Sequence, residues 1–133
     1  MIDVENEIFA EVSKRIREKF PSAFVTGEYV KSPSSFPCIS LIEADNSTFS
    51  QSRTVAGEEH AMVMYEANVY SNKTKGKKAE CKEIVAIIDE TLAGLNFSRI
   101  MLEPVPNLDD ATIYRMLGRY RAIVSKNNTI FRR

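Results

Sequence analysis

Acidic side chains next to strand-like segments are the residues of this sequence that could do chemistry. Glu66 and Glu103 fall within two such segments, Asp109 and Asp110 precede a third, and Lys73 follows the first. Carboxylates at strand ends, together with a lysine, can hold Mg²⁺ against a phosphate, as a metal-dependent nuclease requires. We favour a structural interpretation, because an Asp-Asp pair before a strand is more simply a turn closed by an Asx hydrogen bond.

Other catalytic patterns are missing from the sequence. The glycines are too far apart for a phosphate-binding loop, and no serine sits in a G-x-S-x-G turn. His60 is the only histidine, so a histidine-rich metal site is excluded. Cys38 and Cys81 lack a CxxC spacing and are expected to be buried, reduced thiols. We therefore expect no enzyme activity, no metal and no cofactor.

The two longest strand-like segments, Met62–Tyr70 and Thr112–Ser125, each alternate between an apolar side and a mixed side. A mixture of arginine, tyrosine, methionine and leucine is typical of protein–protein interfaces. The alternative is a solvent-exposed face on which Glu66 pairs with arginines across the strands. We favour the interface. The mixed side would carry Met64, Glu66, Asn68, Tyr70, Arg115, Leu117, Arg119, Arg121 and Ile123.

Two segments have helical periodicity and would cover the apolar side of these strands. The first, Val4–Phe20, has Asp3 as its expected N-cap and ends before Pro21. The second follows the polar turn Ser71–Gly76 and is expected to stop at Gly94, because glycine readily takes the left-handed conformation.

Shorter strands complete the expected fold. Ala23–Val30 and Cys38–Ala44 are expected to form a hairpin, Phe97–Val105 is a further strand, and Lys126–Arg133 is a tail or a short edge strand. The order α-β-β-β-α-β-β predicts an α+β fold, with a mostly antiparallel sheet and two helices packed on one face.

Between two of these strands lies a polar stretch, Asp45–Glu59, that follows neither a helical nor a strand period. A loop of about 15 residues inside a compact domain is usually functional or disordered. We interpret it as a loop that becomes ordered against a partner, with Phe49 and Arg53 as its contacts.

Length and composition limit the class of protein. The 133 residues predict one domain spanning 1–133. Eighteen basic and eighteen acidic residues cancel, which argues against a dedicated nucleic-acid binder. The acidic start of the chain does not fit a signal peptide, and no apolar run is long enough to span a membrane. The two expected reduced thiols suit a cytosolic origin.

Several short motifs resemble the tail terminator proteins of long-tailed bacteriophages, also called tail completion or head–tail joining proteins. The resemblance covers about Tyr65–Val124 and is carried by Val69–Lys73, Lys82–Glu90, Asn96-Phe97, Pro104–Asp110 and Ile113–Arg115 with Arg119-Tyr120. The first helix and the following strands agree with that family in order and length only.

The resemblance implies a structural virion protein at the tail–head junction, assembled in the host cytoplasm as a homohexameric ring. Such a ring caps the tail tube, ends its polymerisation and presents a surface to a head-completion or connector protein. Double-stranded DNA passes through the lumen only in transit, and no membrane is involved. The family supplies no functional residue, so the residues themselves provide the interface candidates Phe49, Arg53, Glu66, Arg115, Arg119 and Arg121. Another head–tail connector or neck subunit is the main alternative, and a small Mg²⁺-dependent nuclease is a weaker one.

Overall fold

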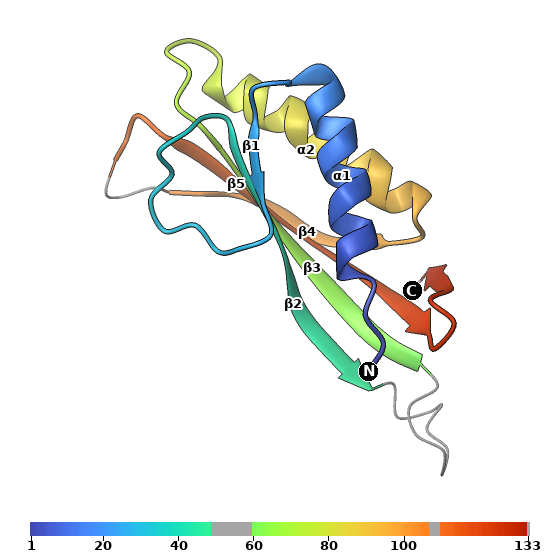
Figure 1. Ribbon diagram of the computed structural model, residues 1–133. Helices are drawn as coiled ribbons and strands as arrows, with labels where there is room; N and C mark the ends of the chain where they lie inside the picture. Colours follow the sequence, from blue (N-terminus) through green and yellow to red (C-terminus); the bar gives the residue numbers. More distant parts are fainter. Residues whose placement is uncertain (49–59, 107–109, 133) are drawn as a thin grey trace.

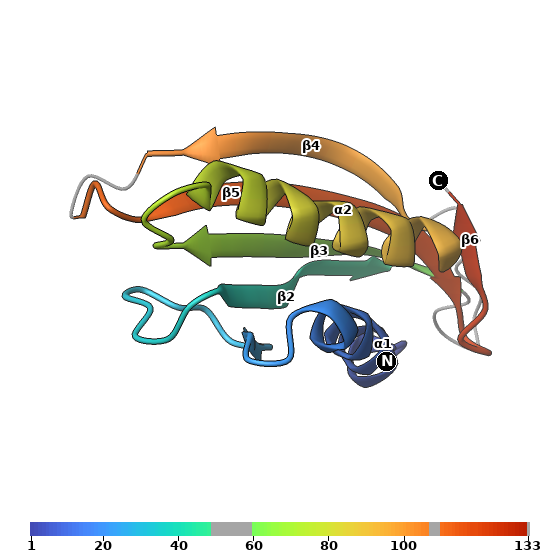
Figure 2. The same ribbon diagram turned by 90° about the horizontal axis from the view of Figure 1, so that it is seen from above.

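A mixed sheet carries both helices on one of its faces in the computed structural model, which describes residues 1–48, 60–106 and 110–132 (Figures 1 and 2). The described elements are α1 (Glu5–Lys19), β1 (Phe24–Thr26), β2 (Cys38–Thr48), β3 (His60–Ser71), α2 (Lys77–Gly94), β4 (Ser98–Val105), β5 (Tyr114–Ser125) and β6 (Ile130–Arg132). The predicted α+β class, element order and placement of the helices are confirmed.

The sheet has the strand order β1-β2-β3-β5-β4, and β6 pairs with the end of β5. All described strand pairs are antiparallel except β1 with β2. The predicted hairpin between these two strands is therefore wrong. Residues 27–37 return the chain to the end of the sheet at which β1 began, so Phe24 pairs with Cys38 in a parallel ladder. The prolines and serines of this segment indicate a turn but do not fix the direction of the strand that follows.

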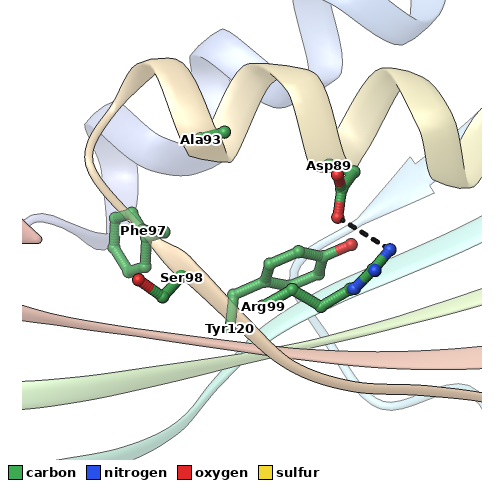
Figure 3. Close-up of a pocket in the computed structure, with 6 residues that line it drawn as sticks. All are labelled: Asp89, Ala93, Phe97, Ser98, Arg99 and Tyr120. Carbon is green, nitrogen blue, oxygen red and sulfur yellow. Dashed lines mark hydrogen bonds and ion pairs between the residues drawn. The ribbon is translucent and has the colours of Figure 1, made fainter. Parts of the chain in front are cut away.

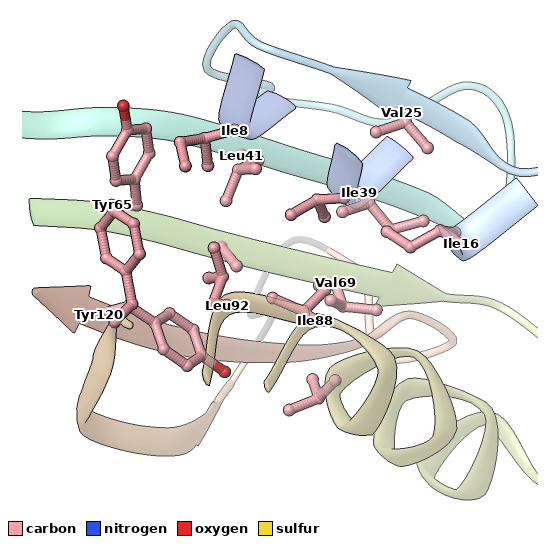
Figure 4. Packing of buried hydrophobic residues seen from close by; sticks show 14 of the residues in the cluster. Ile8, Ile16, Val25, Ile39, Leu41, Tyr65, Val69, Ile88, Leu92 and Tyr120 are labelled. Carbon is pink, nitrogen blue, oxygen red and sulfur yellow. The ribbon is translucent and has the colours of Figure 1, made fainter. Parts of the chain in front are cut away.

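Alternation along the strands creates the core between the sheet and the helices (Figure 4). Ile8 and Ile16 of α1 and Ile88 and Leu92 of α2 are fully buried against the sheet. The ring of Tyr65 meets that of Phe97 edge-on, with centroids 5.4 Å apart. Full burial of an isoleucine, leucine or phenylalanine side chain stabilises a fold by about 1.5–3 kcal/mol.

The ends of both helices differ in detail from the predictions. Val4, not Asp3, is the N-cap of α1, and the Asp3 carboxylate accepts a hydrogen bond from the Glu5 amide at 3.0 Å. At the end of α2, Gly94 stays helical and Asn96 takes the left-handed conformation, with φ of 69°. The amide of Asn96 donates to the carbonyl of Ala93 and that of Phe97 to the carbonyl of Leu92, which is a Schellman motif.

Two irregularities shape the edges of the sheet. A bulge between Glu43 and Asp45 lets β2 continue to Thr48, four residues beyond its predicted end at Ala44, so the start of the predicted 45–59 loop is strand. The rest of that loop, 49–59, lies outside the described residues. A second bulge between Arg99 and Met101 leaves Ile100 exposed on the edge strand β4. Of the predicted tail, Ile130–Arg132 forms an edge strand.

Candidate interaction surface on the open face of the sheet

The face of the sheet turned away from the helices, called here the open face, is built by β3 and β5. The two strands pair without a register shift from His60–Ser125 to Ser71–Tyr114. Because side chains alternate along a strand, the mixed sides of the two strands fall on the same face. The open face comprises Met62, Met64, Glu66, Asn68 and Tyr70 of β3 and Arg115, Leu117, Arg119, Arg121 and Ile123 of β5.

An ion pair lies at the centre of the open face. Glu66 and Arg119 are directly opposite each other, and the guanidinium donates to Glu66 Oε1 at 3.1 Å. Asn68 Nδ2 donates to the other carboxylate oxygen at 3.2 Å. Both oxygens of the buried Glu66 carboxylate are therefore engaged, and the Glu66–arginine pairing expected by the solvent-face alternative is present in the structure.

Asn68 joins this ion pair to a second arginine. Its Oδ1 accepts hydrogen bonds from Arg115 Nε at 3.0 Å and from Arg115 Nη2 at 2.7 Å. The Arg115 guanidinium also lies over the ring of Tyr70, 5.4 Å from its centroid. The Tyr70 hydroxyl donates to the carbonyl of Val30, and burial raises the pKa of this tyrosine. Hydrogen bonds and ring contacts thus fix the rotamers of this part of the open face.

Arg121 differs from the other two arginines. It lies opposite Met64 on one side and Ser98 on the other, and it is half-buried. Its Nε is buried without a hydrogen-bond partner in the described part of the chain. A buried polar group without a partner is costly, and Nδ1 of His60, two residues before Met62 on β3, is in the same state.

Apolar side chains surround these charges. Met62, Met64, Leu117 and Ile123 are each half-buried, in contrast to the fully buried residues on the other side of the same strands. Methionine packs adaptably against irregular surfaces, and arginine is enriched in the centres of interfaces. The open face therefore combines half-buried apolar side chains with a hydrogen-bonded polar centre.

Among the described residues, the carboxylates of the nuclease hypothesis do not form a group with metal-ligand spacing. Glu66 is engaged by Arg119, Glu103 and Lys73 are exposed, and Asp110 accepts a hydrogen bond from the Thr112 amide at 2.9 Å. The hydrogen bond from the Thr112 hydroxyl and then the one from its amide lower the pKa of Asp110, as expected for an Asx turn. Asp109 lies outside the described residues, as do the loop candidates Phe49 and Arg53.

Sequence reasoning missed an acidic cluster at the edge of the sheet. Asp3, Glu5 and Glu43 offer carboxylate oxygens that all lie within 4.8 Å of one another, and among the described residues theirs is the one group with the spacing for a metal ion. Burial and then the nearby charges of Glu5 and Asp3 raise the pKa of Glu43, while hydrogen bonds from Asn46 and Tyr65 oppose the shift. Glu43 is far from the other two in sequence, and only the position of α1 beside β2 reveals the cluster.

A cavity of about 270 Å³ lies between α2 and the strands β4 and β5 (Figure 3). Arg99 and Asp89 form an ion pair of 3.4 Å at its mouth, and the Tyr120 side chain extends toward them. Burial raises the pKa of Tyr120, and the Asp89 carboxylate adds to the effect. Of the described residues that line the cavity, Asp89 is the one carboxylate, and none is a histidine, cysteine or lysine.

Fold and surface together define a small two-layer α+β protein with helices on one side of the sheet and a mixed face, buried in part, on the other. A chain in a solved structure titled "Virion of native gene transfer agent (GTA) particle" is similar to it, with a TM-score of 0.68 and 16% sequence identity. The alignment covers 94% of this chain and 99% of that one. At this identity the likeness shows a shared fold. No protein-family model and no curated protein sequence matches this chain.

Neither described helix has the length and apolar character to cross a bilayer.

Proposed function

We propose that this chain is a structural subunit of a phage-like particle that forms a homohexameric ring at the end of the tail tube. The ring would stop tube polymerisation and join the tail to the head. The observation that carries the proposal is the shared fold with a chain of a gene transfer agent virion, over nearly the full length of both chains. The sequence resemblance to tail terminator proteins supports the same role.

A ring requires head-to-tail contacts, in which two different surfaces of one subunit meet in neighbouring copies. The open face supplies one surface of the required kind, because half-buried methionine, leucine and isoleucine side chains surround a hydrogen-bonded arginine centre. Arg115, Arg119, Arg121 and Glu66 are the residues that we assign to this contact. Phe49 and Arg53 remain candidates for a contact with the tube or the lumen.

The proposed ring has no catalytic role. In support, one oxygen of the Glu66 carboxylate forms an ion pair with Arg119, and the other accepts a hydrogen bond from Asn68, so both are already engaged. The balanced charge of the sequence also suits a conduit, because a strongly basic lumen would hold DNA by counterion release instead of letting it slide. The partners would be the tail tube protein on one side and a head-completion or connector protein on the other.

Tube polymerisation in the presence of this chain tests the proposal. The tube protein from the same particle would be polymerised with and without the purified chain, and tube lengths would be measured by electron microscopy. A terminator shortens the length distribution and appears as an added ring at one tube end. Another neck subunit would leave tube length unchanged and bind only the head side, which would overturn the capping role.

A further inference from the structure

Arg121 is a positive charge of the open face without a carboxylate partner in the described part of the chain. Arg119, two residues earlier on the same face, is held by Glu66. Glu66 cannot serve both arginines with the same geometry, because its second oxygen accepts from Asn68. The Nε of Arg121 is buried within the subunit, but the residue as a whole is only half-buried, so a carboxylate of a neighbouring copy can still approach this unpaired positive charge.

The acidic cluster of Asp3, Glu5 and Glu43 carries negative charges that lack a positively charged partner among the described residues. None of its carboxylates forms an ion pair with a lysine or arginine among the described residues, although they crowd one another. The start of α1 favours acidic residues through the helix dipole, which accounts for Asp3 and Glu5. It does not account for Glu43, which comes from the middle of β2.

The two charged features lie on opposite sides of the sheet. Glu43 is opposite Tyr65, whose side chain packs in the core on the helix side, whereas Arg121 is opposite Met64 on the open face. Glu43 also lies on β2, where β1 pairs only with residues 38–40, so this part of the strand forms an edge of the sheet. One subunit cannot neutralise its own cluster with Arg121, but two copies arranged head-to-tail can.

We propose that Arg121 of one copy binds the carboxylates of Asp3, Glu5 and Glu43 of the next copy, so that the β2 edge of each subunit packs on the open face of its neighbour. The inference rests on the ring proposed above and specifies its subunit contact. A closed, heterologous ring requires two different, complementary surfaces on one chain, and opposite charges on the two surfaces are one form of such complementarity. Half-buried Met62, Met64 and Ile123 would supply the apolar part of the contact.

Charge reversal in both surfaces tests the pairing. The single variants Arg121→Glu and Asp3→Lys each make one like-charge contact at every interface, and each should raise the concentration for half-assembly about tenfold or more. Lys14→Glu and Glu7→Lys are matched controls, because both residues are exposed on α1 and outside the cluster. Assembly would be followed by native mass spectrometry over a concentration series, with circular dichroism to check folding.

Restoration is the decisive part of the experiment. The double variant Arg121→Glu/Asp3→Lys should recover part of the lost assembly, because the two reversed charges can pair while Glu5 and Glu43 stay acidic. An equal mixture of the two single variants should also recover part of the assembly, since the contacts in an alternating ring are then alternately of the wild-type kind and of the doubly reversed kind. Wild-type rings that survive the single reversals, or reversals that neither the double variant nor the mixture restores, would overturn the pairing alone. A wild-type chain that stays monomeric throughout the series would overturn the ring itself.

Discussion

Glu66 and Arg119 face each other across β3 and β5 with an ion pair of 3.1 Å, although the Glu66 side chain is 12% exposed and that of Arg119 is 44% exposed. The two partners therefore depend on the pair unequally. Removing the arginine leaves a buried carboxylate with Asn68 as its remaining side-chain donor, whereas removing the carboxylate leaves a guanidinium that water can reach.

The asymmetry predicts a ranking of variants at this pair. Arg119→Met should lower the free energy of unfolding by about 1–3 kcal/mol, because the buried carboxylate loses its counter-charge. Glu66→Gln should lower it by less, and adding Glu66→Gln to Arg119→Met should restore part of the loss. Urea unfolding would measure the changes. Arg15→Met is the matched control, since the exposed Arg15–Glu11 pair should change stability by less than about 0.5 kcal/mol. Equal losses from both replacements would contradict the unequal dependence.

Asn96 allows a test of the α2 terminus. Asn96→Ala should lower the free energy of unfolding by about 1 kcal/mol, because alanine is strained at a φ of 69° and cannot donate to the Ile130 carbonyl. Asn96→Gly should be nearly neutral, since relief of the left-handed strain offsets the lost hydrogen bond. Thermal unfolding of both variants would measure the difference. If alanine were tolerated as well as glycine, the left-handed conformation would not limit stability there.

The raised pKa of Glu43 predicts how stability depends on pH. Burial and the charges of Glu5 and Asp3 favour the protonated form in the folded state, so the contribution of this group is fully present below the ordinary glutamate pKa. It is lost as pH rises through the raised value. Glu43→Gln should therefore stabilise the protein more at pH 7 than at pH 4, by less than about 1 kcal/mol. Denaturant unfolding at both pH values, with Glu7→Gln as control, would measure it. A larger gain at pH 4 would contradict the assignment.

Burial makes the two thiols unreactive in the folded protein. It raises the pKa of Cys81 to about 12 and also raises that of Cys38, and the Cys81 Sγ lies 3.6 Å from the carbonyl oxygens of Val69 and Tyr114. Iodoacetamide, which attacks thiolates, should label both cysteines at neutral pH only at the rate of unfolding. Mass spectrometry of the native and urea-unfolded chains would measure this. Rapid labelling of the native chain would contradict the burial.

Periodicity in the sequence predicted the helices, the long strands and the composition of the open face, because burial against one layer selects residues at fixed spacing. The direction of β1 could not be predicted, since residues 27–37 could have led to either pairing. The left-handed residue at the end of α2 was predicted at Gly94 but is Asn96, because asparagine also tolerates that conformation. The cluster of Asp3 and Glu5 with Glu43 depends on tertiary packing, which local patterns do not record.

Native mass spectrometry of the purified chain, combined with negative-stain images of the same sample, tests the central claim most directly. We expect a closed hexamer of the 15.1 kDa chain, seen as a ring around an open channel. A single monomeric species across the whole concentration range, with no annular particles, would contradict the account.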